Sequence, residues 1–206
     1  MTSPETVASA HVVVQAYADF DEVLFTENIG ILRGSLDCFD ATLAPTDAVI
    51  VHKALGLLNF ANGDDGLSLE SWRAVGSLEP SFTASYDLMP ESSPLRKILM
   101  NAKPSTTTVA ITPLHIGAWH VDGKRVDAVP AQGAFLLVAA SEEKVFYSGY
   151  HYSPFTIPSL ESPYKKEGHV AQKKVGLLMT TVFGVLAGTA LVLRQQQIHA
   201  LQSSDT

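Results

Sequence analysis

The stretch that decides the architecture of this chain is VGLLMTTVFGVLAGTALVL, residues 175–193. It contains no charged side chain and no Asn, Gln, His or Pro. As a helix, its 19 residues would be about 28 Å long, close to the roughly 30 Å hydrocarbon core of a bilayer. A buried helix of this length normally carries a polar stripe, whereas only Thr180, Thr181 and Thr189 are polar here. The stretch therefore predicts a single C-terminal transmembrane helix.

Basic residues border this stretch on both sides and are the expected membrane-interface anchors. On its N-terminal side stand four lysines, and on its C-terminal side one arginine: Lys165, Lys166, Lys173, Lys174 and Arg194. The excess of lysine predicts that the N-terminal side faces the cytosol, the matrix or the stroma. Only the tail at 194–206 would then lie on the opposite side of the membrane. This is the topology of a tail-anchored protein, or of an organellar single-pass protein with the same orientation.

The predicted span also has a face of small residues, formed by Gly176, Thr180, Gly184 and Gly188. They recur at every fourth position, so they line one side of a helix, and Gly184 and Gly188 form a GxxxG pattern. Such a face favours close packing against another membrane helix. The alternative interpretation is that glycine is simply common in transmembrane helices.

Composition excludes several classes of protein. The chain has 206 residues, of which 46% are apolar and 17% charged, and its net charge is −7. These values disfavour a disordered chain and a nucleic-acid binder. Cys38 is the only cysteine, which excludes an internal disulfide scaffold. Charge is polarised, because residues 1–91 hold 14 acidic and three basic side chains while residues 92–206 hold seven and 11.

The N-terminal region has no recognisable targeting character. Residues 1–32 contain no Lys or Arg, although a transit peptide is rich in Arg and a secretory signal begins with basic residues. A targeting signal is therefore expected either inside the chain or in a segment that preceded residue 1.

The first half of the chain reads mainly as helix. Apolar residues at three- and four-residue spacings predict a helix within residues 5–25, using Val12, Ala16, Phe20, Val23 and Leu24. Further helices are predicted over 46–61, capped by Thr46-Asp47 and ended by Asn62-Gly63, over 68–75, and from Ser93-Pro94 onward. Residues 76–92 are expected to be irregular.

From residue 106 the pattern changes to short β-branched and aromatic runs. These are TTTVAIT at 106–112, AWHVDGKRVDAV at 118–129, GAFLLVAA at 133–140 and KVFYSGYHY at 144–152. Asp122-Gly123 between two alternating runs predicts a hairpin, and the whole region predicts an antiparallel sheet of about four strands. The fold class is therefore α+β: a helical N-terminal half, a small antiparallel β-sheet, then the transmembrane helix.

Four parts follow along the chain. Residues 1–152 are predicted to form a soluble α+β domain. Residues 153–174 contain Pro154, Pro158 and Pro163 and are predicted to be a stiff connector with basic juxtamembrane lysines. The transmembrane helix at 175–193 and the short polar tail at 194–206 complete the chain.

No motif for catalysis or metal binding emerges. His115, His120 and His151 could supply imidazoles for zinc or copper, but their spacing favours surface or half-buried histidines. The segment NGDDG at 62–66 lacks the ligand pattern of a calcium loop and is read as a turn that ends a helix. Ser148-Gly149 lacks the G-x-S-x-G context of a nucleophile elbow, and Cys38 lies between acidic residues that oppose thiolate formation.

The sequence leaves the roles of two further groups of residues open. Haem ligation by His52 or His199 is a remaining alternative, although CxxCH is absent. The aromatic run Phe146, Tyr147, Tyr150, His151, Tyr152 and Phe155 is interpreted as a packing or membrane-interfacial surface.

The sequence predicts a non-catalytic, single-pass accessory subunit of a large membrane protein complex. The favoured home is a respiratory-chain or ATP synthase complex of the mitochondrial inner membrane, with the domain on the matrix side. Expected partners are other subunits and the lipid bilayer, without nucleic acid, and no cofactor is expected apart from a bound structural lipid. The alternative is a free-standing tail-anchored protein of the outer mitochondrial, plastid or ER membrane, whose domain binds a partner or acts as an enzyme.

Overall fold

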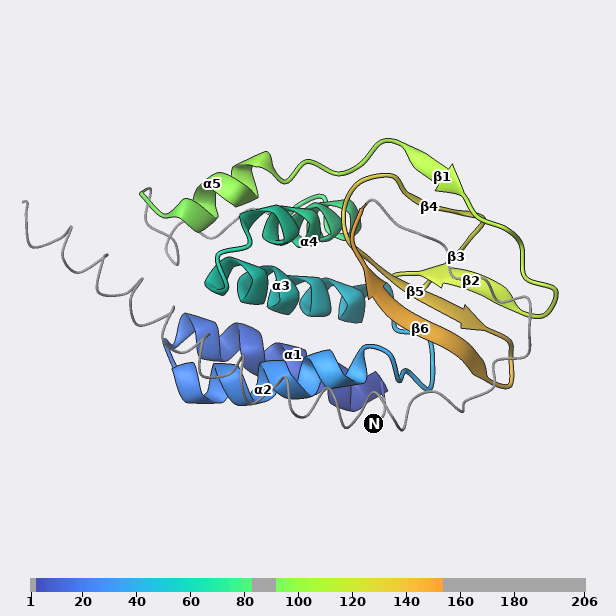
Figure 1. The fold of residues 1–206 in the computed structure, drawn as a ribbon, viewed down its shortest axis with the longest axis horizontal. Coiled ribbons are helices and arrows are strands. Elements are labelled where there is room, and N and C mark those ends of the chain that lie inside the picture. Colours follow the sequence, from blue (N-terminus) through green and yellow to red (C-terminus); the bar gives the residue numbers. More distant parts are fainter. Residues whose placement is uncertain (1–2, 83–91, 154–206) are drawn as a thin grey trace, which may run out of the picture. The chain divides into compact units, whose positions relative to one another are not determined.

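The computed structural model describes residues 3–82 and 92–153, and in them the fold is α+β, as predicted (Figure 1). Helices are gathered on one side of this domain and strands on the other. The helices are α1 Ser3–Ala18, α2 Glu22–Ser35, α3 Pro45–Ala61, α4 Asp65–Leu78 and α5 Pro94–Asn101.

The strands form two antiparallel sheets. They are β1 Thr108–Ala110, β2 Ala118–Val121, β3 Lys124–Val126, β4 Ala128–Pro130, β5 Phe135–Ala140 and β6 Val145–His151. The larger sheet has the order β3-β2-β5-β6, and β1 pairs with β4 in a two-stranded sheet. Antiparallel pairing of neighbouring strands was expected, whereas the separate two-stranded sheet was not.

Helix α3 lies at the centre of the helical layer, where it packs against both α1 and α4. Pro45 fits its first turn because that position needs no amide donor, and the helix ends at the C-cap Asn62 with Gly63 at a φ of +80°. The stop signal was predicted, but the N-cap is Ala44 and no side chain caps the helix. The spacing of Ile50, Val51, Ala54, Leu55 and Leu58 predicts an apolar stripe on this helix; four of the five are buried, and Ile50 is only partly buried.

The predicted helix within residues 5–25 was wrong, because two helices occupy this region. The chain turns at Asp19–Asp21 and begins α2 at Glu22, with Asp21 as N-cap. This turn changes the phase of the apolar pattern, so Phe20 and Val23 are exposed while Phe25 is buried. The turn contains no glycine or proline, so the apolar periodicity alone predicted one continuous helix.

Other boundaries differ in smaller ways. Helix α4 begins at Asp65, because Asp64 accepts a hydrogen bond from the backbone N–H of Leu67, and it extends to Leu78 rather than ending at 75. The irregular region predicted from residue 76 therefore begins later. Helix α5 begins at Pro94, as predicted from Ser93-Pro94, and buries Leu95, but the expected cap by the Ser93 hydroxyl is not formed.

The β2–β3 hairpin has the predicted Asp122-Gly123 turn. Both residues have positive φ, +50° and +81°, which is the geometry of a type I′ turn. Gly123 is required for a second reason. A Cβ atom built on it would lie 2.0 Å from the carbonyl oxygen of Leu43, so the hairpin tip sits directly on the chain leading into α3.

The larger sheet is buried on both faces at its centre. Leu136, Val138 and Ala140 of β5 belong to the same core cluster as the helices. The alternate residues of β5, Phe135, Leu137 and Ala139, point to the opposite face and are fully buried too. The helices and the sheet therefore share one core, with a second buried set behind the sheet.

The predicted connector at 153–174, transmembrane helix and tail lie outside the described residues, apart from Ser153. Among residues 3–82 and 92–153, no helix is long and apolar enough to cross a membrane.

Candidate functional site

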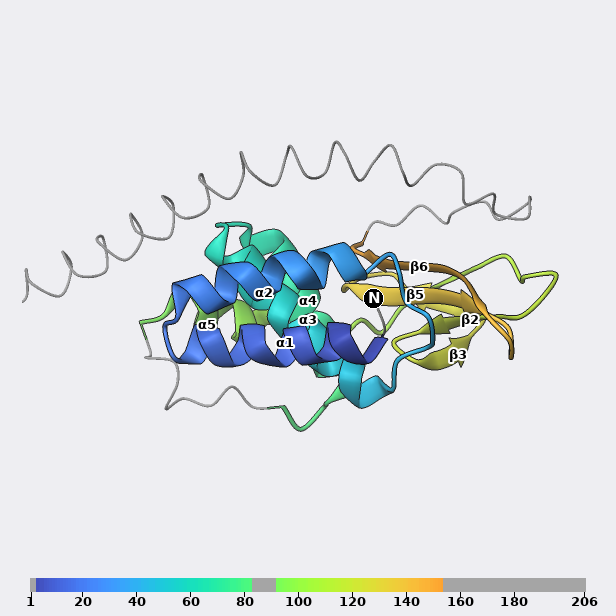
Figure 2. The same cartoon turned by 90° about the horizontal axis from the view of Figure 1, so that it is seen from below.

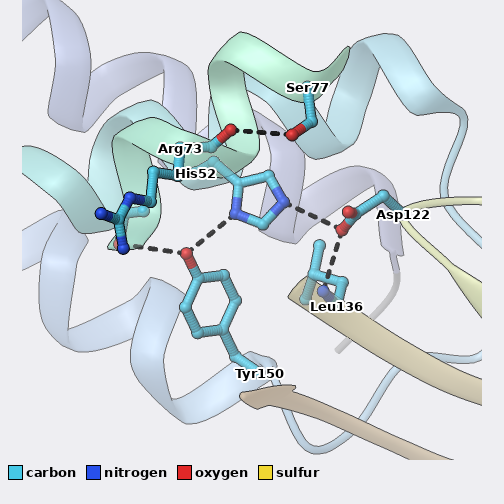
Figure 3. A network of polar contacts seen from close by, with 7 residues as sticks. His52, Arg73, Ser77, Asp122, Leu136 and Tyr150 are labelled. Atoms are coloured by element: carbon cyan, nitrogen blue, oxygen red, sulfur yellow. Dashed lines mark hydrogen bonds and ion pairs between the residues drawn. The ribbon is translucent and has the colours of Figure 1, made fainter. Parts of the chain in front are cut away.

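The centre of the candidate site is His52, a histidine on the inner face of α3 (Figure 3). It follows Val51 and precedes Ala54 and Leu55 in the apolar stripe, so the helix carries it into the core. Its side chain is 0% exposed, and both ring nitrogens have partners. A buried polar ring needs such partners, because leaving one nitrogen unpaired costs about 1–3 kcal/mol.

The first partner of His52 is Asp122, which the β2–β3 turn points inward. The Nε2 atom of His52 lies 2.9 Å from Oδ1 of Asp122. The same carboxylate oxygen accepts the backbone N–H of Leu136 at 2.9 Å, while the N–H of Asp122 donates to the carbonyl of Leu136 at 3.0 Å. Asp122 thus connects the hairpin turn, strand β5 and helix α3.

The second partner is Tyr150 of β6, whose hydroxyl oxygen lies 2.8 Å from Nδ1 of His52. A carboxylate can only accept, so in the neutral ring Nε2 carries the proton and Nδ1 accepts from the Tyr150 hydroxyl. That oxygen also lies 3.2 Å from Oγ of Ser71, on α4. Burial raises the pKa of Tyr150 well above its ordinary value, with a further contribution from neighbouring Tyr152.

Tyr152 continues the polar cluster towards the surface. Its hydroxyl accepts a hydrogen bond from Nδ2 of Asn59 at 2.8 Å. Burial raises the pKa of Tyr152, although the hydrogen bonds from Asn59 and Ser71 act in the opposite direction. We call the six side chains His52, Asn59, Ser71, Asp122, Tyr150 and Tyr152 the polar cluster.

A pocket of about 460 Å³ opens beside the outer end of the polar cluster. Its lining combines aliphatic side chains with charged, amide and phenolic groups: Arg33, Leu36, Asp37, Leu55, Leu58, Asn59, Asn62, Asp64, Leu67, Tyr150 and Tyr152. Seven of these eleven side chains carry polar or charged groups, so the pocket is better suited to a polar ligand than to an apolar one.

Asp122, His52 and Tyr150 are connected in the same order as the acid, the base and the nucleophilic hydroxyl of a catalytic triad. Two features oppose that chemistry. His52 has no exposed surface, and a phenol whose pKa is raised by burial keeps its proton and is a poor nucleophile. The arrangement is instead suited to fixing α3, α4 and the sheet to one another.

The histidines that could have formed a metal site are not brought together. His120 lies on β2, His115 lies in the loop before it, and His151 ends β6, where its Nε2 bonds the Tyr147 hydroxyl at 2.7 Å. Across the described part of the chain, no three His, Cys, Asp or Glu side chains are grouped to hold a metal ion.

The remaining motifs have structural roles. In NGDDG, Asn62 and Gly63 end α3 and Asp64 caps α4, which confirms the reading as a turn. Ser148 is buried, and its Oγ accepts the N–H of Phe39 at 3.1 Å. Cys38 is exposed. Both nitrogens of His52 are already bonded, so as placed it is not an axial haem ligand, and His199 lies outside the described residues.

The site residues predicted in and around the membrane helix also lie outside the described residues. The polar cluster, by contrast, was missed. A signal for it existed, since a histidine inside an apolar helical stripe must be buried and needs two partners, and an Asp in a two-residue hairpin turn is one of few groups that could reach it.

Comparison with protein-family models, curated proteins and solved structures gives no match.

Proposed function

We propose that this chain is a non-catalytic, single-pass accessory subunit of a large membrane protein complex. The observation that carries the proposal is the uncharged run at 175–193 between Lys174 and Arg194. It supplies the anchor, and the preceding α+β domain supplies a folded surface on the positive side of the membrane.

The polar cluster supports a structural role for the domain. Its members come from α3, α4, the hairpin turn and the end of β6, and they bond one another. A network of this kind fixes the arrangement of elements, because each buried polar group has its partner only in one packing. A rigid domain of this kind can fill a fixed place in an assembly.

The proposed home is a respiratory-chain or ATP synthase complex of the mitochondrial inner membrane, with the domain in the matrix. Such complexes contain many single-pass subunits without catalytic residues, and the juxtamembrane lysines favour the matrix side. Outer mitochondrial, plastid and ER membranes are the alternatives for the same orientation.

The test begins with extraction of isolated membranes by alkaline carbonate. The full chain should stay in the pellet, and deletion of residues 175–206 should release it. Mild detergent followed by native electrophoresis should then place the full chain in a complex far larger than 22.1 kDa, with its neighbours identified by mass spectrometry. Complete release by carbonate would refute the anchor, and migration as a monomer would refute the subunit role.

The pocket favours a second candidate function, that of a free-standing tail-anchored protein whose domain binds a partner molecule. Its volume of about 460 Å³ is within the usual range for small-molecule sites. Arg33 provides a cation at its edge, and Asn59 and Tyr152 provide amide and hydroxyl groups. A monomeric chain with a thermal shift on adding a small ligand, abolished in Arg33→Gln, would favour this candidate.

A further inference from the structure

The turn between α1 and α2 has an unusual residue at its critical position. Helix α1 ends with the N–H of Asp21 donating to the carbonyl of Ala16 at 2.9 Å and the N–H of Phe20 donating to that of Tyr17 at 3.3 Å. These two bonds define a Schellman motif, in which the residue after the C-cap adopts a left-handed conformation. That residue is normally glycine, but here it is Phe20, with a φ of +57°.

A bulky side chain in this conformation is unfavourable, and little burial of the side chain compensates for it here. Phe20 is 83% exposed. It stands just before the N-cap of α2, where an apolar residue often packs on the fourth helical residue, Phe25. Phe25 is buried, with its ring centroid 6.0 Å from that of Tyr17, while Phe20 keeps most of its surface in solvent.

Phe20 is part of a small exposed apolar patch. Val23 is 78% and Leu24 39% exposed in the first turn of α2. We call Phe20, Val23 and Leu24 the apolar tip. Figures 1 and 2 both show the α1–α2 turn at the end of the helical layer far from the strands. The apolar tip is therefore placed to reach a neighbouring molecule.

Along the chain, the apolar tip is flanked by carboxylates. Asp19, Asp21 and Glu22 adjoin it and Glu27 follows one turn later on α2, while residues 1–32 contain no Lys or Arg. An apolar centre with a charged rim is the usual anatomy of a protein interface. The acidic rim requires a partner surface of positive charge.

We propose that the apolar tip is a docking knob, with Phe20 inserting into an apolar pocket of a partner protein whose rim carries Lys and Arg. Such a contact would explain why an exposed aromatic residue is kept at a position where its backbone conformation is unfavourable. The inference rests on the proposed subunit role, and it names which surface of the domain meets the complex.

A membrane is the other surface that could receive exposed apolar side chains. The matrix and cytosolic faces of membranes are negatively charged, so the acidic rim would be repelled from them. A protein pocket with basic groups matches both the apolar side chains and the carboxylates of the apolar tip, whereas symmetric pairing of the tips of two copies would place like charges together.

Photocrosslinking at the apolar tip tests the contact directly. The full chain carrying p-benzoylphenylalanine at position 20 is expressed in its own membranes and irradiated, and the crosslinked residue on the adduct is identified by mass spectrometry. The expected result is one dominant protein adduct at an apolar site flanked by Lys or Arg. The matched control carries the same group at Ile116, which is 71% exposed in the loop before β2.

Variants at Phe20 then separate docking from folding. Phe20→Gly should raise the melting temperature of the full chain by about 2–5 °C, because glycine relieves the left-handed strain. It should also weaken association with the crosslinked partner about tenfold or more. Phe20→Ala should weaken association equally without raising the melting temperature, and Ile116→Ala should leave association unchanged.

Several outcomes would overturn the inference. These are an adduct on lipid, an adduct only on a second copy, labelling no stronger than at Ile116, or normal association of Phe20→Gly. If the chain still migrates in a large complex, these results refute only the docking knob. If it migrates as a monomer, the subunit role itself fails.

Discussion

The imidazole of His52 and the carboxylate of Asp122 lie 2.9 Å apart inside the domain, although they are separated by 70 positions in the chain. One belongs to the central helix and the other to a two-residue hairpin turn. Their contact joins the helical layer to the sheet at a point where His52 has no exposed surface and Asp122 is buried. The stability of the domain should therefore depend strongly on this pair.

Replacement of Asp122 should show how much the pair contributes. Asp122→Ala leaves the Nε2–H of His52 and the N–H of Leu136 without an acceptor, and it places alanine at a φ of +50°. We expect a loss of about 2–4 kcal/mol in the free energy of unfolding, measured by urea titration of the full chain in detergent. Asp122→Asn keeps an acceptor and tolerates the turn, so it should cost about 1 kcal/mol. Equal stability of wild type and Asp122→Ala would contradict this role.

Tyr150 offers a test of the other side of His52. Tyr150→Phe keeps the ring but removes the hydroxyl that bonds Nδ1 of His52, so we expect a loss of about 1–2 kcal/mol. Tyr147→Phe is the matched control, because its hydroxyl bonds the half-buried His151 on the other face of β6. The control should cost less than about 1 kcal/mol, and a reversed order would mean that the polar cluster is not the stabilising network.

His151 should make stability depend on pH. Burial lowers the pKa of His151 from 6.5 to about 4, so the folded state favours the neutral ring. Its contribution is complete above pH 6.5, falls as the pH drops towards about 4 because the unfolded chain takes up the proton first, and is constant below that. Since the ring keeps part of its surface in water, we expect about 1–2 kcal/mol across this window.

The control for this pH dependence is His151→Gln, which removes the titrating group. Melting temperatures measured between pH 7 and pH 4 should fall less steeply in the variant than in the wild type. Parallel curves would show that other groups cause the acid destabilisation.

Replacing each of two glycines by alanine should change the stability of the chain in opposite directions. Gly123→Ala introduces a Cβ that would lie 2.0 Å from the carbonyl oxygen of Leu43, at a φ of +81°, so we expect a loss of about 3 kcal/mol or more. Gly30 lies inside α2 with nothing within 4 Å of an added Cβ. Gly30→Ala should therefore stabilise the chain by about 0.5–1 kcal/mol. Thermal unfolding of the two variants measures both effects, and the same sign for both would refute the placement of one of them.

Much of the fold could be predicted because its local signals agree with its packing. Asn62-Gly63 ends α3, Asp122-Gly123 forms the hairpin, and the alternating runs become strands. The break between α1 and α2 could not be predicted, because Phe20 occupies a position where glycine would have announced the turn.

The partners of His52 in the polar cluster could not be predicted for a different reason, although its place in the apolar stripe of α3 indicated that it would be buried. The members of the polar cluster are spread over 100 positions, from His52 to Tyr152, and no local pattern pairs a helix histidine with one particular turn and one particular strand. The two-stranded sheet of β1 and β4 was not predicted for the same reason, because strand pairing across intervening elements has no short-range sequence signature.

The small-residue face predicted for residues 175–193 leads to a test of assembly within the membrane. Gly184→Leu combined with Gly188→Leu would prevent close approach of another helix, while leaving insertion intact because leucine is as apolar as lipid. A loss of about 1–2 kcal/mol would weaken association around 5–30-fold. We expect the double variant to resist carbonate extraction like the wild type but to copurify poorly with its complex. Should it copurify normally while Phe20→Gly does not, the domain and not the span would carry the interface. Normal copurification even when the domain is deleted would exclude docking through this helix face.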